Sequence, residues 1–219
     1  MKLHRDLGNL YDIAFCLTHL SRNTIYGGDF SSPSAWLDEA KTLFHELGAQ
    51  PDEADVINIS GVLAYWQGNS QHAIACFEQA IALDEKVGDR YWSNWPRANM
   101  AYTFLRDGNS QQAGKYFKIC LQRFQKDGSS IGMVYAIEGL ACLYANEGDA
   151  EPAVRLFACA DAMRKTLGNP RPLIEQGNVD QGTTACLALM GEAAYSDAYE
   201  EGQRMTLDEA VAFALSDQK

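Results

Sequence analysis

The apolar residues of this chain recur at steps of three and four, which predicts amphipathic helices along most of its length. In three segments a small residue, a phenylalanine and a second small residue follow one another at steps of four and three. These are Ala73, Phe77 and Ala80; Ala113, Phe117 and Cys120; and Ala153, Phe157 and Ala160. Residues at these spacings share one face of a helix. The small residues therefore let a second helix approach, and the phenylalanine fills the space between the two.

Glycines divide these helical segments at a fixed interval. One series steps by 40 residues, and a second series with the same step is offset by 20: Gly28, Gly68, Gly108 and Gly148, and Gly48, Gly88, Gly128 and Gly168. An acidic or amide residue follows each member of the first series: Asp29, Asn69, Asn109 and Asp149. We expect each of these glycines to end one helix in the left-handed conformation, and the next side chain to cap the following helix.

The sequence therefore predicts an all-α fold of stacked helix hairpins. Four pairs are expected, over residues 8–48, 49–88, 89–128 and 129–168. Two prolines and two glycines then predict a loop and a weak helix over residues 169–190: Pro170, Pro172, Gly177 and Gly182. Residues 191–219 are expected to form capping helices, because Thr206 and Glu209 make a capping box before an apolar stripe.

The small, aromatic, small signature with its glycine-acid turn resembles the tetratricopeptide repeat. The usual period of that repeat is about 34 residues, so the period of 40 implies longer helices. Residues 138–168, EGLACLYANEGDAEPAVRLFACADAMRKTLG, and residues 191–215, GEAAYSDAYEEGQRMTLDEAVAFAL, form a second likeness. They resemble the end of the helical-repeat region of LuxR-type, MalT-like ATP-binding transcription regulators and related predicted ATPases.

These resemblances imply a right-handed superhelix of four hairpins, closed by C-terminal capping helices. Regulators of this kind also carry an ATPase module and often a DNA-binding module. The sequence has no GxxxxGK[ST] phosphate loop and no basic helix-turn-helix. We therefore expect either a stand-alone relative or a piece of a larger regulator.

The charge balance disfavours several kinds of partner. Lys and Arg number 18 and Asp and Glu number 29, which gives a net charge of −11. A chain this acidic repels phosphate backbones, so direct nucleic-acid binding is not expected. No apolar run of about 18 residues is present, so we expect no membrane span. The six cysteines are scattered and no signal segment precedes them, which predicts reduced thiols in a cytoplasmic protein.

The sequence offers no catalytic or metal-binding pattern. No nucleophile, base and oxyanion donor come together, so we expect neither an enzyme nor a cofactor. The four histidines lack HExxH or Cys/His spacing, so no metal site is expected: His4, His19, His45 and His72. Cys120 and Cys142 occupy small-residue positions of the repeat, where core packing explains them.

The most informative surface is the concave groove that the tetratricopeptide resemblance implies. In such proteins the first helix of each pair lines this groove. Counting back from the turn glycines gives the predicted groove residues: Phe15, Arg22, Tyr26, Asn58, Val62, Tyr65, Trp66, Trp95, Tyr102, Arg106, Tyr135, Glu138 and Asn146. Tyr, Trp and Arg often dominate binding energy, and Asn can hold a peptide backbone. The alternative is that these aromatic residues pack between adjacent helices.

A dense aromatic cluster at the start of the third pair has two interpretations: Tyr91, Trp92, Trp95, Pro96 and Arg97. It can be an aromatic anchor with a cation-π partner. It can also be the junction between the second and third repeats, which is the interpretation we favour.

Together these features predict a non-catalytic scaffold that binds a protein or peptide. We expect it to be the partner-docking or sensor region of a bacterial signalling or transcription regulator. The alternative is an allosteric sensor in which the groove binds a small-molecule inducer, as the MalT-like resemblance implies. The uncapped first hairpin also suggests a homodimer through the N-terminal repeat.

Overall fold

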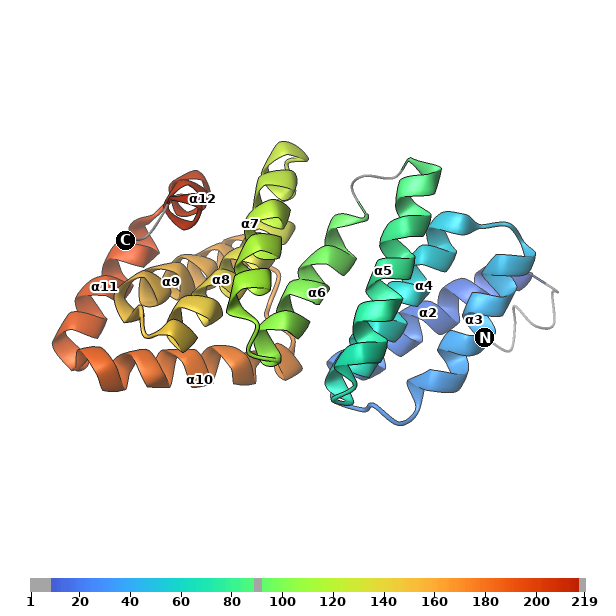
Figure 1. Ribbon diagram of the computed structural model, residues 1–219, viewed down its shortest axis with the longest axis horizontal. Helices are drawn as coiled ribbons and strands as arrows, with labels where there is room; N and C mark the ends of the chain where they lie inside the picture. The colour runs from blue at the N-terminus through green and yellow to red at the C-terminus, as the bar shows by residue number, and fades with distance from the viewer. Residues whose placement is uncertain (1–8, 89–91, 217–219) are drawn as a thin grey trace. The chain divides into compact units, whose positions relative to one another are not determined.

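The computed structural model describes residues 9–88 and 92–216, and these residues form eleven α-helices and no strand (Figure 1). The all-α class is therefore confirmed. The helices are α2 (Leu10–Tyr26), α3 (Pro33–Glu46), α4 (Gln50–Trp66), α5 (Ser70–Val87), α6 (Asn94–Arg106), α7 (Ser110–Lys126), α8 (Ser130–Glu147), α9 (Ala150–Leu167), α10 (Leu173–Met190), α11 (Glu192–Arg204) and α12 (Leu207–Leu215). The chain forms two compact units, Met1–Thr103 and Phe104–Lys219, and each is described by itself.

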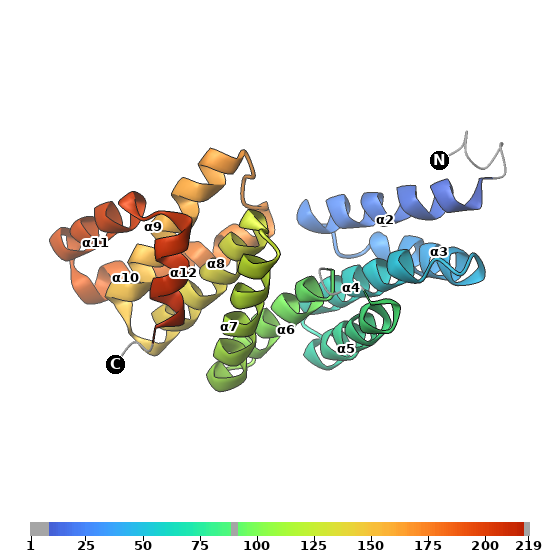
Figure 2. The same cartoon turned by 90° about the horizontal axis from the view of Figure 1, so that it is seen from above.

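Unit 1 contains two helix hairpins and most of α6. Helix α2 packs against α3, and α4 packs against α5. Helix α3 also contacts α4, which joins the two hairpins (Figure 2). The inner helices α2 and α4 touch as well, so the first helices of successive pairs lie side by side.

Unit 2 contains a central hairpin with helices packed around it. Helix α8 packs against both α7 and α9. Helix α10 contacts α8 and α9, and α11 lies along α9. Helix α12 returns to contact α7, α8 and α9. The C-terminal helices therefore cover the last of the predicted hairpins.

The turn glycines adopt the predicted backbone conformation. All eight have φ between 62° and 89°, the left-handed region: Gly28, Gly48, Gly68, Gly88, Gly108, Gly128, Gly148 and Gly168. A residue with a Cβ is strained at this φ, so glycine is the residue that lets the chain reverse there. The two glycine series therefore mark equivalent bends, as the sequence predicted.

The predicted helix caps are confirmed at two of the four positions. The side chains of Asn69 and Asn109 accept hydrogen bonds from the third backbone amide of α5 and of α7. Asp149 makes no side-chain cap hydrogen bond, so the prediction is wrong there. Asp29 instead accepts bonds from the backbone amides of Ser31 and Ser32, in the turn that precedes α3.

The small, aromatic, small signature forms the buried core. Phe77 is 0% exposed, and a Cβ added to Gly61 would lie 2.5 Å from its ring. Gly139 of α8 faces Phe117 of α7 at similarly close range. Because a real Cβ cannot approach a ring so closely, glycine at these positions lets the helices nest.

The segment after α9 differs from its prediction of a loop and a weak helix. The irregular part ends at Pro172, and α10 is a complete helix of 18 residues. Both prolines precede its first turn, where they do not interrupt its hydrogen bonds. Gly182 is buried against Phe157, and a Cβ there would lie 2.8 Å from the ring. Gly182 is thus a packing residue of the repeat rather than a helix breaker.

The C-terminal cap follows its prediction closely. The Thr206 side chain accepts a bond from the Glu209 amide, and the Glu209 carboxylate accepts one from the Thr206 amide. This reciprocal pair is the predicted capping box. Ala210, Val211 and Ala214 then bury the apolar face of α12.

Candidate functional site

The predicted groove residues of unit 1 begin with an ion pair between two inner helices. Arg22 of α2 donates from Nη2 to both carboxylate oxygens of Asp55 on α4, at 2.7 and 2.6 Å. The two side chains are 28% and 33% exposed. The pair is therefore a surface feature that joins α2 to α4 and neutralises the charge of both residues.

A second polar bridge joins α4 to α6. The Asn99 amide nitrogen donates to the Asn58 side-chain oxygen at 2.9 Å, and both residues are half-buried. An asparagine side chain has a donor and an acceptor, so Asn58 can hold a peptide backbone in addition to this bond. Sequence reasoning missed Asp55 and Asn99. They lie within one residue of the 40-residue register of predicted groove positions, and this spacing could have found them.

Some aromatic residues of the predicted groove pack within the chain. Tyr65 is 9% exposed and meets Trp66 edge to face, with ring centroids 4.9 Å apart. Trp66 is stacked on Phe30 at 6.1 Å, and Gln67 donates to the Phe30 carbonyl at 2.7 Å. These contacts tie the end of α4 to the loop after α2. Tyr26 and Val62 are half-buried.

Aromatic side chains are also partly exposed on the inner helices. Phe15 of α2 is 47% exposed and lies 4.3 Å from the His19 ring. Trp95 and Tyr102 of α6 are half-buried. Phe15 therefore presents the largest accessible apolar surface among the predicted groove residues of unit 1.

The aromatic cluster at the start of α6 supports its junction interpretation. Arg97 is 8% exposed and donates to the Ser93 carbonyl at 2.6 Å and to the Glu85 carboxylate. Pro96 is buried beside it, whereas Trp92 is exposed. Arg97 thus ties the end of α5 to the start of α6. Tyr91 lies outside the described residues.

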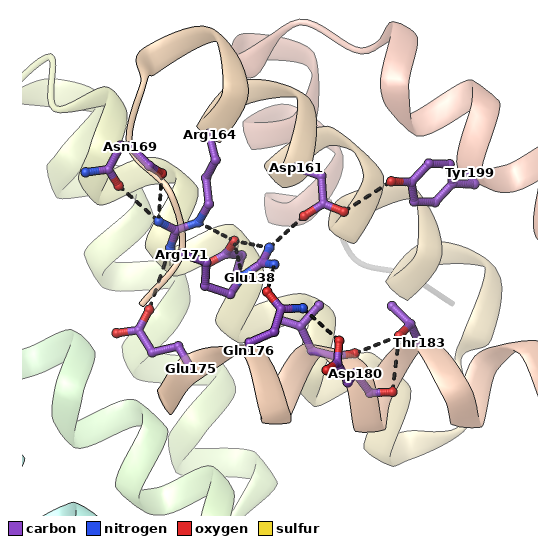
Figure 3. Close-up of polar contacts among 11 residues, drawn as sticks. Glu138, Asp161, Arg164, Asn169, Arg171, Glu175, Gln176, Asp180, Thr183 and Tyr199 are labelled. Carbon is purple, nitrogen blue, oxygen red and sulfur yellow. Dashed lines mark hydrogen bonds and ion pairs between the residues drawn. The ribbon is translucent and has the colours of Figure 1, made fainter. Parts of the chain in front are cut away.

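The predicted groove residues of unit 2 lie in different environments. Arg106 and Asn146 are exposed and Tyr135 is half-buried. Glu138 is only 2% exposed, which differs from its predicted place on an open groove. It lies instead at the centre of a buried set of charged residues, the Glu138 cluster (Figure 3): Glu138, Asp161, Arg164, Arg171 and Glu175.

Two arginines enclose the Glu138 carboxylate. Arg164 of α9 donates from Nε to Oε1 and from Nη2 to Oε2, both at 2.6 Å. Arg171, from the segment before α10, donates from Nη2 to Oε1 at 2.6 Å and from Nε to the same oxygen at 3.1 Å. Paired, charge-assisted bonds of this kind are the strongest hydrogen bonds available to a carboxylate.

The cluster extends from Arg171 to the C-terminal helices. Arg171 Nη2 also donates to Asp161 Oδ1 at 2.7 Å, and the Tyr199 hydroxyl donates to Asp161 Oδ2 at 3.1 Å. Arg171 Nη1 donates to the Gln176 side chain at 2.9 Å. The network therefore joins α8, α9, α10 and α11. Its key residue, Arg171, lies in the segment expected to be a loop, where no helical periodicity marks it.

Burial also sets the chemistry of the titratable groups in unit 2. It raises the pKa of Glu175 to about 7, an effect that Glu138 increases and that Arg164 and Arg171 oppose. Burial raises the pKa of the Cys142 thiol to about 12 and that of Cys159 to about 11. Thiols with such pKa values stay protonated at neutral pH, which suits the predicted packing role of Cys142.

Neither of two other kinds of site is found in the described part of the chain. It contains no group of three His, Cys, Asp or Glu side chains placed to hold a metal ion. None of its helices combines the length and apolar character that crossing a bilayer requires.

These features define a helical-repeat protein of the tetratricopeptide type. The family model for the tetratricopeptide repeat matches residues 56–87, which include most of α4 and all of α5. The regulatory protein RapG of Bacillus subtilis (strain 168) is 27% identical to the chain over 143 residues. The alignment includes 64% of this chain and 38% of RapG, so the chain corresponds to well under half of that relative.

Solved structures of repeat proteins share the fold. BtubC (BKLC) from P. vanneervenii superimposes with a TM-score of 0.65 at 18% identity, over 97% of this chain and 84% of BtubC. A kinesin light chain of Podosopora anserina with nearly identical TPR-like repeats gives a TM-score of 0.56 at 16% identity, over 87% of this chain and 96% of the other. At such identities the likeness shows the fold alone.

Proposed function

We propose that the chain is a non-catalytic scaffold that binds a protein or peptide through the inner helices of its repeats. The observation that carries this proposal is one register position repeated every 40 residues. The position holds Phe15, Asp55, Trp95 and Tyr135, and none of the four is buried. Three aromatic residues at one partly exposed position are more than core packing requires, and aromatic side chains are enriched at the centres of interfaces.

The inner face of unit 1 supplies the complementary polar groups. The Arg22–Asp55 pair and the Asn58–Asn99 pair lie on the same helices as Phe15 and Trp95. A bound peptide would place an apolar side chain against Phe15, and its backbone would hydrogen-bond to Asn58. The polar pairs are already formed, which lowers the conformational cost of binding.

The proposal also covers the biological setting. We place the chain in a bacterial signalling regulator, as its partner-docking or sensor region. The description of RapG as a regulatory protein supports this setting, as does the resemblance of residues 138–168 and 191–215 to LuxR-type regulators. We retain a cytoplasmic location and a homodimer through α2 as parts of the same proposal.

The test uses a displayed library of random twelve-residue peptides, because it assumes no particular partner. Peptides selected on the wild-type chain are measured against Phe15→Ala and Asn58→Leu. Each variant should weaken binding about tenfold or more, which corresponds to roughly 1.4 kcal/mol.

Leu47→Ala is the matched control, because Leu47 is 46% exposed at the end of α3, away from the inner helices. It should leave the affinity unchanged. The proposal fails if no peptide is selected. It also fails if the selected peptides bind the Phe15 and Asn58 variants as tightly as the wild type.

A further inference from the structure

The charges of the Glu138 cluster do not balance. Three carboxylates, those of Glu138, Asp161 and Glu175, share two guanidinium groups. Glu138 and Asp161 accept hydrogen bonds from Arg171 at 2.6 and 2.7 Å. Glu175 is the remaining acid, and its closest ion contact in the described residues is Arg164 Nη2 at 3.8 Å. A charge at Glu175 is therefore the least compensated charge in the cluster.

Glu175 also occupies a position where its charge affects helix packing. It lies in the first turn of α10, and its side chain is 17% exposed. Glu138 faces it from α8, Arg164 and Asp161 from α9, and Arg171 from the preceding segment (Figure 3). Tyr199 of α11 reaches the cluster only through Asp161. When Glu175 is neutral, Glu138 and Asp161 balance the two arginines and α10 docks without an excess negative charge.

We propose that protonation of Glu175 is a switch that controls how firmly the N-terminal half of α10 docks on α8 and α9. The neutral acid favours the docked helix, and the carboxylate favours release of its first turns. This regulation is additional to peptide binding and does not depend on it.

The direction and range of the pH response follow from the folded and unfolded states. Burial and the charge of Glu138 raise the pKa of Glu175 to about 7 in the folded chain, from 4.5 in the open one. The protonated form therefore stabilises docking fully below pH 4.5. This stabilisation is lost as the pH rises towards 7. For opening that exposes Glu175, these two values predict about tenfold more opening at pH 8 than at pH 6.

Hydrogen exchange of the full chain tests the switch, because it reports opening helix by helix. Protection factors are measured between pH 6 and pH 8 for amides in the first two turns of α10, with those of α5 as an internal reference. In the wild type the α10 protection should fall about tenfold over this range. In Glu175→Gln it should stay constant and equal or exceed the wild-type value at pH 6, because the amide cannot ionise.

Glu147→Gln is the matched control, since Glu147 is exposed at the end of α8. It should keep the wild-type response. The switch is disproved if wild-type α10 protection is independent of pH. It is also disproved if Glu175→Gln retains the tenfold change. A carboxyl NMR titration of Glu175 adds an independent readout, and a midpoint below 5 would also contradict the proposal.

Discussion

Replacing Glu138 by alanine separates a structural role from a binding role at this position. The substitution removes the acceptor of four hydrogen bonds and leaves Arg164 and Arg171 facing each other. Their side chains are only 9% and 7% exposed, so water cannot readily replace the lost carboxylate. Removing one partner of a buried ion pair costs about 3–5 kcal/mol. At about 2–4 °C per kcal/mol for a chain of this size, the melting temperature should fall by about 6–20 °C.

Urea unfolding followed by circular dichroism measures this loss, and Glu147→Ala is the control in the same helix. Glu147 is exposed at the end of α8, so its replacement should change stability by less than about 0.5 kcal/mol. A Glu138 variant that loses less than about 1 kcal/mol, yet no longer binds the selected peptides, would refute the buried cluster. It would instead support the groove position expected from the sequence.

Three further predictions test the packing, the cap and the N-terminal surface. Gly139→Ala should cost about 1–3 kcal/mol by thermal unfolding, because its Cβ overlaps the Phe117 ring; Phe117→Leu in the same chain should recover part of that loss. Thr206→Ala should cost about 0.5–2 kcal/mol and speed amide exchange at the start of α12, since it removes the capping box; unchanged exchange would contradict this. Leu20→Glu should make a chain that sediments as a dimer monomeric, because Leu20 is 37% exposed on α2; a wild-type monomer would exclude the dimer.

The helix hairpins could be predicted from the sequence because their signals are local. A turn glycine fixes a backbone conformation by itself, so the 40-residue series predicted the reversals of α4 and α5 as well as those of α8 and α9. Glycine within a helix is ambiguous by contrast. Gly182 looks like a helix breaker along the chain, and only the position of Phe157 shows that it is a contact. The same reasoning explains why α10 was expected to be weak.

The site was harder to predict because inner-helix positions differ in burial from one register to the next. Glu138 and Asn58 share a register, being two 40-residue steps apart, and both were expected to line the groove. The other two members of that register are Thr18 and Ala98, which are 4% and 0% exposed. The register therefore faces the neighbouring helices, and a charged residue placed there needs a buried partner. Arg171 is that partner, and it lies 33 residues away in a segment without periodicity.

The same comparison identifies the positions that can contact a partner. Ile25, Tyr65 and Ala145 share another register and are 1%, 9% and 6% exposed, so Tyr65 belongs to the core. Replacing Tyr65 would therefore lower stability before it affected binding. The register of Phe15 is exposed or half-buried at every inner helix, and its side chains can change without opening a cavity. If the chain binds a peptide, the energetic contribution should come from the Phe15 register, and a binding loss confined to Tyr65 variants would argue against the proposed surface.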